Sequence, residues 1–103
     1  MSGTVTLHAA TLERLEVPIR ATSDPTATAP DWSLTAPGAT APGSWTAGSW
    51  NGTWTGGRAT AVSPTIGASG QLVVASGGTY RAWVRVTAGG EVAVWPVGAI
   101  RVP

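Results

Sequence analysis

Residues 79–97 have the sequence TYRAWVRVTAGGEVAVWPV, and this stretch decides the fold. Side chains of alternating character follow one another on both arms, from Tyr80 to Thr87 and from Glu91 to Val97. Alternation with a period of two is typical of a β-strand whose two faces meet different surroundings. Between the arms, residues 88–90 (AGG) are predicted to form a three-residue loop, because glycine adopts the positive φ angles that such loops need. The stretch therefore predicts a β-hairpin.

The predicted loop also sets the register of the hairpin, because it places Thr87 opposite Glu91. The valines of both arms are then expected to face the core, since Arg81 and Arg85 lie on the other face and arginine is rarely buried. That other face holds two tryptophans, on which the arginines can stack through cation–π contacts. The alternative is that Trp83 and Trp95 lie inward and the valines outward. The predicted cross-strand pairs are Val86 with Val92, Val84 with Val94 and Trp83 with Trp95.

The composition of the 103-residue chain indicates a single all-β domain. Residues that favour helices are scarce, whereas Gly, Pro, Thr, Ser, Val and Trp dominate. Short runs of strand character recur at the spacing of a β-sandwich, so we expect about seven or eight short antiparallel strands. Outside the hairpin, the predicted strands cover residues 15–20, 31–35, 50–55, 58–63, 71–75 and 98–102, and residues 4–7 are a weak first strand or an extended arm.

Three local features refine this prediction. Pro18 cannot donate a hydrogen bond to a sheet, so the strand at 15–20 is expected at an edge. Tyr80 follows Leu72 by eight residues and resembles the tyrosine corner of immunoglobulin-like sandwiches, in which the hydroxyl bonds to backbone upstream. Residues 1–14 are expected to be an N-terminal strand or an arm that docks on a neighbour, and residues 15–103 to form an immunoglobulin-like β-sandwich.

Charge and cysteine content exclude several functional classes. The net charge is +1, with six basic and five acidic residues and no basic stripe, so nucleic acid is not expected as a partner. The chain has no cysteine, so it forms no disulfide and no thiolate metal site. The N-terminal sequence lacks the pattern of a secretion signal, and the longest apolar run, residues 92–100, is interrupted by Pro96 and Gly98 and is too short to span a membrane. A protein made in the cytosol, without a membrane partner, is expected.

Groups suited to catalysis or metal binding are sparse. His8 is the only histidine, and Glu13 and Glu16 are more typical of a solvated face than of a catalytic pair. Asp24 and Asp31 occur in turn-like contexts, where a carboxylate commonly bonds to its own backbone. We therefore expect no enzyme activity, no catalytic residue, no metal ligand and no cofactor.

The segment 37–57 is rich in Gly and Pro and contains three Gly-(Ser/Thr)-Trp units, which end in Trp45, Trp50 and Trp54. One interpretation is a loop and a strand whose tryptophans plug the core from the side. The other is an aromatic binding surface. Trp50 and Trp54 would share a face if residues 50–55 are extended, and Trp45 would fall on the other.

Four segments give the chain a likeness to a known family: LEVPI (15–19), GSWTAGSW (43–50), GTYRAWVRV (78–86) and GAIRV (98–102). In this order they resemble the small immunoglobulin-like head proteins of tailed phages that infect actinobacteria. The segment 37–57 departs from the pattern of that family. The resemblance implies a structural role in the virion, either as a decoration protein on the major capsid lattice or at the head–tail neck, and it implies no catalytic residue.

Tryptophan content agrees with a binding role, because the six tryptophans exceed what so small a core needs and Trp is favoured at interfaces. The partners expected are major capsid or connector subunits and further copies of the chain within the virion. The residues predicted to form the partner interface are Arg81, Trp83, Arg85, Trp95, Trp45, Trp50 and Trp54.

A carbohydrate-binding module is the alternative from another functional class. Its platform would be Trp45, Trp50 and Trp54, stacked on sugar rings. The missing secretion signal and the lack of an attached catalytic domain argue against it.

Overall fold

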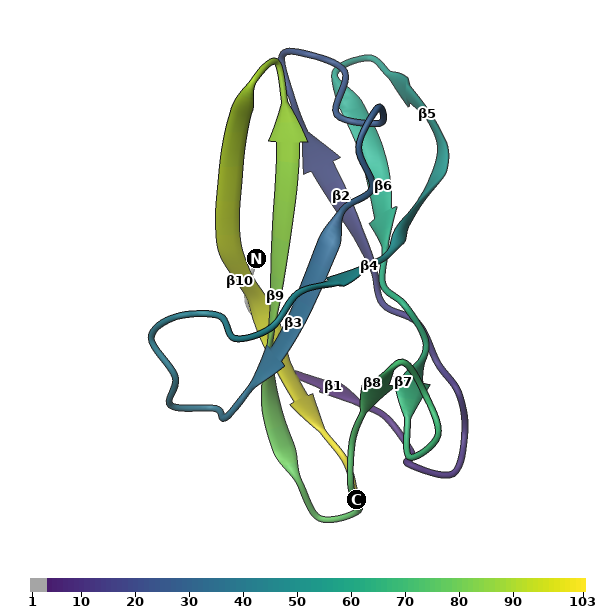
Figure 1. Ribbon diagram of the computed structural model, residues 1–103. Helices are drawn as coiled ribbons and strands as arrows, with labels where there is room; N and C mark the ends of the chain where they lie inside the picture. The colour runs from purple at the N-terminus through teal and green to yellow at the C-terminus, as the bar shows by residue number, and fades with distance from the viewer. Residues whose placement is uncertain (1–3) are drawn as a thin grey trace.

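The computed structural model describes residues 4–103, where it contains ten strands and no helix, so the predicted all-β class is confirmed. The first three residues of the predicted N-terminal strand or arm lie outside the described range. Figure 1 labels the strands along the chain. Their bounds are β1 Thr4–Thr6, β2 Glu16–Arg20, β3 Asp31–Thr35, β4 Thr46–Ala47, β5 Ser49–Thr55, β6 Arg58–Val62, β7 Ile66–Gly67, β8 Leu72–Val73, β9 Thr79–Ala88 and β10 Glu91–Arg101.

The strands form a five-stranded sheet in the order β1-β10-β9-β3-β4, a three-stranded sheet in the order β2-β6-β5, and a small sheet of β7 and β8 (Figure 1). The prediction of a fully antiparallel arrangement is wrong, because β1 runs parallel to β10 and β7 runs parallel to β8. The predicted number of strands is too low, because short strands such as β4 and β7 lie outside the predicted strands.

The hairpin of β9 and β10 is present, but its predicted register is wrong by one residue. Glu91 faces Ala88, so the loop consists of only Gly89 and Gly90, with φ angles of 59° and 82°. Positive φ at both central residues is the condition of the type I′ turn, the commonest tight hairpin turn. The observed pairs are Val92 with Thr87, Ala93 with Val86, Val94 with Arg85, Trp95 with Val84 and Pro96 with Trp83.

A shift of one residue turns every side chain of the second arm to the opposite face. Val84 and Val86 of β9 face the core as predicted, whereas Val92 and Val94 lie on the outside, 61% and 43% exposed. Trp95 occupies the inner face instead and packs against the core.

The second arm continues without a break into the segment predicted as a separate closing strand. The register shifts between Pro96 and Gly98, which marks a β-bulge, and the pairing with β9 then runs on to Arg101. A bulge inserts one extra residue, so Val97 is buried and Ile100 still reaches the core.

The core lies between the five-stranded and the three-stranded sheets, because buried side chains of both contact one another. Trp32 of β3 is the largest of them and is 1% exposed. The other buried members are Leu7, Val17, Ile19, Ala61, Ile66, Leu72, Val74, Ala82, Val84, Val86, Val97, Ile100 and Val102.

Two local sequence predictions, the edge position of the strand with Pro18 and the hydroxyl contact of Tyr80, are confirmed. β2, which contains Pro18, is an edge strand of its sheet. The hydroxyl of Tyr80 accepts a hydrogen bond from the backbone N–H of Ala75, at 3.0 Å, as the tyrosine-corner pattern predicted. At the other edge, β1 pairs with residues Ala99 to Arg101 of its own chain.

Gly48 marks the point where the chain passes from one large sheet to the other, between β4 and β5. Its N–H donates to the carbonyl of Pro30, at 2.7 Å. A β-carbon at this position would overlap the carbonyl oxygen of Val62 and lie 2.7 Å from Nε1 of Trp32. Among the described residues that Nε1 is buried without a hydrogen-bond partner, so packing contacts and not a hydrogen bond fix the position of the indole ring.

Gly48→Ala is therefore expected to destabilise the fold by about 1–3 kcal/mol, the usual cost of overpacking a filled core. For a chain of this size each kilocalorie lowers the melting temperature by about 4–8 °C. Thermal unfolding followed by circular dichroism measures the shift.

Gly38→Ala is the matched control, because nothing lies within 4 Å of a β-carbon built there. An unchanged melting temperature is expected for this control. A Gly48→Ala variant as stable as Gly38→Ala would show that the crossing is not tightly packed.

Candidate functional site

The outer face of the five-stranded sheet is the best candidate for a binding surface. Cross-strand pairing places Asp31 beside Arg85 and Ser33 beside Trp83 on this face. On the other side of β9, Val94 lies beside Arg85. The face therefore combines apolar and charged side chains in adjacent rows.

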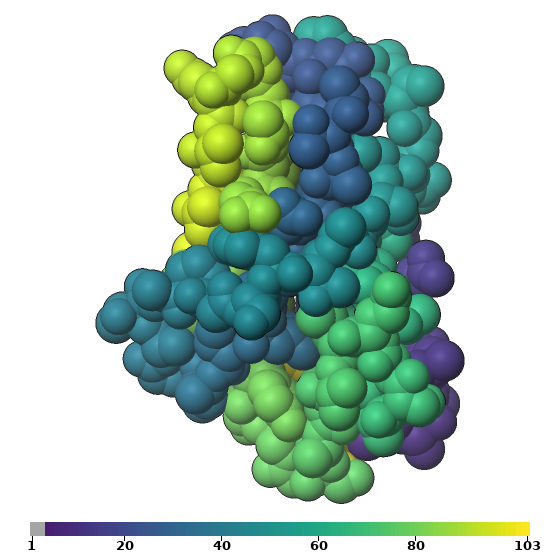
Figure 2. Space-filling view, in the orientation of Figure 1, coloured from purple at the N-terminus to yellow at the C-terminus, as the bar shows by residue number. Residues whose placement is uncertain are grey.

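The loop of residues 36–45, which stands out at the left in Figures 1 and 2, covers the part of this face that holds Arg81 and Trp83. Arg81 donates from Nη1 to the carbonyl of Ala39, at 2.9 Å. The indole N–H of Trp83 donates to the hydroxyl of Thr35, also at 2.9 Å. The N–H of Gly43 donates to the hydroxyl of Ser33, at 3.1 Å. Trp83 is consequently only 6% exposed.

The prediction that Trp83 and Trp95 share one outer face is wrong. Trp83 lies on the outer face under the 36–45 loop, whereas Trp95 lies on the inner face beside Val84. The two-residue turn is the cause, since it moves the second arm by one position relative to the first.

Arg85 is held in a defined position by a carboxylate and an indole. Its Nη2 and Nε lie 2.7 Å and 3.0 Å from Oδ2 of Asp31. Its guanidinium carbon lies 4.6 Å from the ring centroid of Trp45, within the range of a cation–π contact.

The sequence predicted an arginine stacked on a tryptophan of this face, and the guanidinium carbon of Arg81 is indeed 5.9 Å from the ring centroid of Trp83. The contact with Trp45 was not predicted, because 40 residues separate the two in the sequence. Asp31 was expected to bond to its own backbone; it begins the predicted strand β3, and its carboxylate pairs with Arg85.

We call Val92, Val94, Arg85 and Trp45 the outer patch. The two valines are exposed, and Val94 is the cross-strand neighbour of Arg85. Arginine and tryptophan are enriched at protein interfaces, and an arginine already fixed by its neighbours loses little side-chain entropy on binding. The outer patch therefore has the chemistry of a protein-binding surface. Sequence reasoning missed its valines, although Gly89-Gly90 was a signal for the two-residue turn that exposes them.

Trp50 and Trp54 lie on the other sheet, on β5, and turn toward the connection between β2 and β3. Trp50 donates from Nε1 to the carbonyl of Thr28, at 2.9 Å, and Trp54 donates to the carbonyl of Ala21, at 3.2 Å. Both are half-buried, and Trp50 packs against the core. Trp50 and Trp54 lie on the same side of β5, as predicted. Trp45 contacts Arg85 on the other sheet. The three tryptophans thus do not form one platform.

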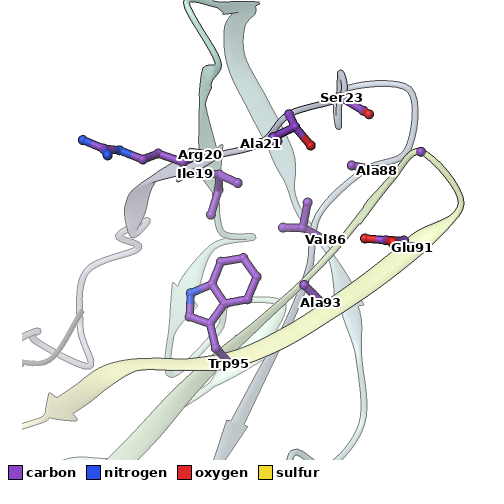
Figure 3. A pocket seen from close by; sticks show the side chains of 11 residues that line it. Ile19, Arg20, Ala21, Ser23, Val86, Ala88, Glu91, Ala93 and Trp95 are labelled. Carbon is purple, nitrogen blue, oxygen red and sulfur yellow. The ribbon is translucent and has the colours of Figure 1, made fainter.

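A cleft of about 410 Å³ opens between the ends of β2, β9 and β10 (Figure 3). Ile19, Val86 and Trp95 form its apolar wall, and Ala93 leaves space beside Trp95. Glu91 lies on the same face of β10, two residues before Ala93. The sequence did not reveal the cleft, because the predicted register placed Trp95 on the outside. The remaining lining residues are Arg20, Ala21, Thr22, Ser23, Ala88 and Gly89.

Asp24 shapes the connection that borders this cleft. Its Oδ1 accepts hydrogen bonds from the hydroxyl and from the backbone N–H of Thr26, at 2.6 Å and 2.9 Å, as the predicted turn requires. These two hydrogen bonds lower the pKa of the Asp24 carboxyl, because both stabilise its ionised form, and the bond from the Thr26 hydroxyl has the larger effect.

Glu13 and Glu16 have local hydrogen-bond partners. Glu13 accepts a hydrogen bond from the backbone N–H of His8, and Glu16 accepts one from the side-chain amide of Asn51. Within residues 4–103, no three His, Cys, Asp or Glu residues are close enough to hold a metal ion. The same part of the chain has no helix that could cross a membrane.

Comparisons with protein-family models, with curated proteins and with solved structures found no match to this chain.

The contact between Trp45 and Arg85 is predicted to stabilise the fold by about 0.5–1 kcal/mol, as cation–π pairs at partly exposed sites do. A double-mutant cycle of Trp45→Leu and Arg85→Met, measured by urea unfolding, isolates this coupling because both replacements keep apolar volume. Strictly additive effects of the two substitutions would contradict it.

Stability is expected to fall in acid partly through Asp24. Its pKa is lower in the folded state, so its contribution is present above the unfolded-state value of about 4 and is lost as the pH falls through the folded value. In Thr26→Val the pKa of the Asp24 carboxyl should rise toward its usual value. A carbon-detected NMR titration of that carboxyl measures the change, and an identical pKa in both proteins would exclude the hydroxyl as the cause.

Proposed function

We propose that the chain is a non-enzymatic structural protein of a tailed-phage virion, a capsid decoration protein that binds the major capsid lattice through the outer patch. The assignment to a virion rests on the resemblance carried by residues 15–19, 43–50, 78–86 and 98–102. The observation that supports a protein-binding role is the outer patch itself, where exposed Val92 and Val94 adjoin an arginine that Asp31 and Trp45 hold in place.

The two large sheets are, within this proposal, an immunoglobulin-like sandwich with additional short strands. The tyrosine-corner contact from Tyr80 to Ala75 supports this assignment, as does the core enclosed between the sheets. The parallel strand β1 and the loop of residues 36–45 are the additions.

The proposed contact depends on apolar side chains beside a fixed charge. Val92 and Val94 supply area whose removal from water favours association, at about 25 cal/mol per Å². Arg85 supplies direction, since its remaining N–H groups can donate to carbonyl or carboxylate oxygens of a capsid subunit. A position at the head–tail neck would use the same surface.

The test uses purified heads, lacking this chain, of the phage that encodes it. Heads are mixed with the protein and sedimented, and the bound protein is quantified. The wild type should cosediment, whereas Val92→Glu/Val94→Glu should bind at least about tenfold less, because it places two charges in the buried contact.

Val73→Glu is the matched control, because Val73 is 67% exposed on β8 and lies outside the outer patch. It should bind as the wild type does. Electron microscopy of the reconstituted heads then separates the two positions: labelling over the whole shell supports decoration, and labelling at the portal vertex alone contradicts it in favour of the neck. No cosedimentation of the folded wild-type protein would overturn the proposal.

A further inference from the structure

The cleft beside Trp95 combines an indole, a carboxylate and an empty space between them. On β10, Glu91, Ala93 and Trp95 alternate onto the inner face, as their partners Ala88, Val86 and Val84 on β9 show. Ala93 has the smallest side chain of the three, so a hollow remains between the carboxylate and the ring. Figure 3 shows Glu91 pointing from β10 toward the space in front of Val86.

The charge inside the cleft is negative. Arg20 also lines it, but alternate residues of β2 are exposed and buried, and Ile19 is the one that faces inward. Arg20 pairs with Arg58 on the outer face of the three-stranded sheet. In Figure 3 its guanidinium points away from the cleft. Glu91 is thus the charged group that a molecule entering the cleft would meet.

Elsewhere in this protein, a carboxylate and an indole ring together already hold one arginine. Arg85 is bound by the carboxylate of Asp31 and lies over the ring of Trp45. Glu91 and Trp95 offer the same two groups in the cleft, and no cation of residues 4–103 forms an ion pair with Glu91 or a cation–π contact with Trp95. The apolar walls formed by Ile19 and Val86 suit the aliphatic stem of an arginine, which packs on apolar surface while its head remains polar.

We infer that this cleft binds an arginine side chain of a partner protein, with the guanidinium stacked on Trp95 and donating to the carboxylate of Glu91. Arginine fits better than lysine, because its planar guanidinium stacks on aromatic rings and donates two parallel hydrogen bonds to a carboxylate. This site is separate from the outer patch and does not depend on the proposed virion role.

The probe is the peptide acetyl-Gly-Arg-Gly-amide, titrated into the ¹⁵N-labelled protein and followed by NMR. Saturable shifts are expected for the indole N–H of Trp95 and the backbone N–H of Ala93, with a dissociation constant in the millimolar range that is usual for one side chain. The peptide with citrulline in place of arginine has the same shape without the charge. It should bind at least about fivefold more weakly, because charge-assisted hydrogen bonds are the stronger kind.

Glu91→Gln is the test variant, since Glu91 is exposed and an exposed substitution of this kind is expected to leave the fold intact. It should weaken binding by about fivefold or more. Glu16→Gln removes the same charge from an exposed site on β2 and should bind as the wild type does. Ala93→Leu should abolish binding by filling the hollow.

Equal affinity of wild type and Glu91→Gln, equal affinity for the arginine and citrulline peptides, or shifts confined to Trp45 would each overturn the inference. Cleft signals that move on dilution of the protein alone would assign the cleft to a second copy and overturn the assignment to a partner protein. Saturable shifts with methyl β-glucoside and none with the arginine peptide would overturn it in favour of a sugar.

Discussion

The two-residue turn at Gly89-Gly90 is the constraint on which the arrangement of both candidate surfaces depends. Only glycine adopts positive φ at both positions without steric cost, and that geometry fixes Glu91 opposite Ala88. From this pairing it follows that Trp95 enters the inner face while Val92 and Val94 remain outside. A loop one residue longer would exchange them. It would put two valines in the core and leave an indole on the surface.

The elements of the fold could largely be predicted from the sequence, because they depend on local patterns. The strand at Asp31–Thr35, the edge position of the strand with Pro18 and the hydroxyl contact of Tyr80 all follow from alternation or from the chemistry of one residue. The register could not be predicted, since loops of two and of three residues both suit Ala88-Gly89-Gly90. The parallel strand β1 depends on a contact with residues almost a hundred positions away. No local pattern encodes such a contact.

The candidate sites were less predictable than the fold for the same reason. The sequence correctly marked Arg81 and Arg85 as partners for indole rings, but the ring over Arg85 belongs to Trp45, in a segment that resembled a loop. The three tryptophans of that segment contact two different parts of the chain. Trp50 and Trp54 bind backbone carbonyls of one connection, and Trp45 covers an arginine. In this segment rich in Gly and Pro, the aromatic side chains thus add contacts to the backbone pairing of β4 with β3 and of β5 with β6. The high tryptophan content, taken alone, therefore does not identify a binding surface.

The outer patch and the cleft lie on opposite faces of one short segment, because alternate residues of a strand point to opposite sides. Val92 and Val94 belong to the patch, and Glu91 and Trp95 belong to the cleft. Within the described chain, β1 pairs only with Ala99 to Arg101, so the first half of β10 has no second neighbour. A free edge of this kind invites strand addition, but Pro96 has no N–H to offer and interrupts the row of donors. Recognition at this strand is then expected to use side chains, on one face or on both. A partner that reached around the edge would contact the valines and the cleft together, and the two contacts would reinforce each other by effective concentration.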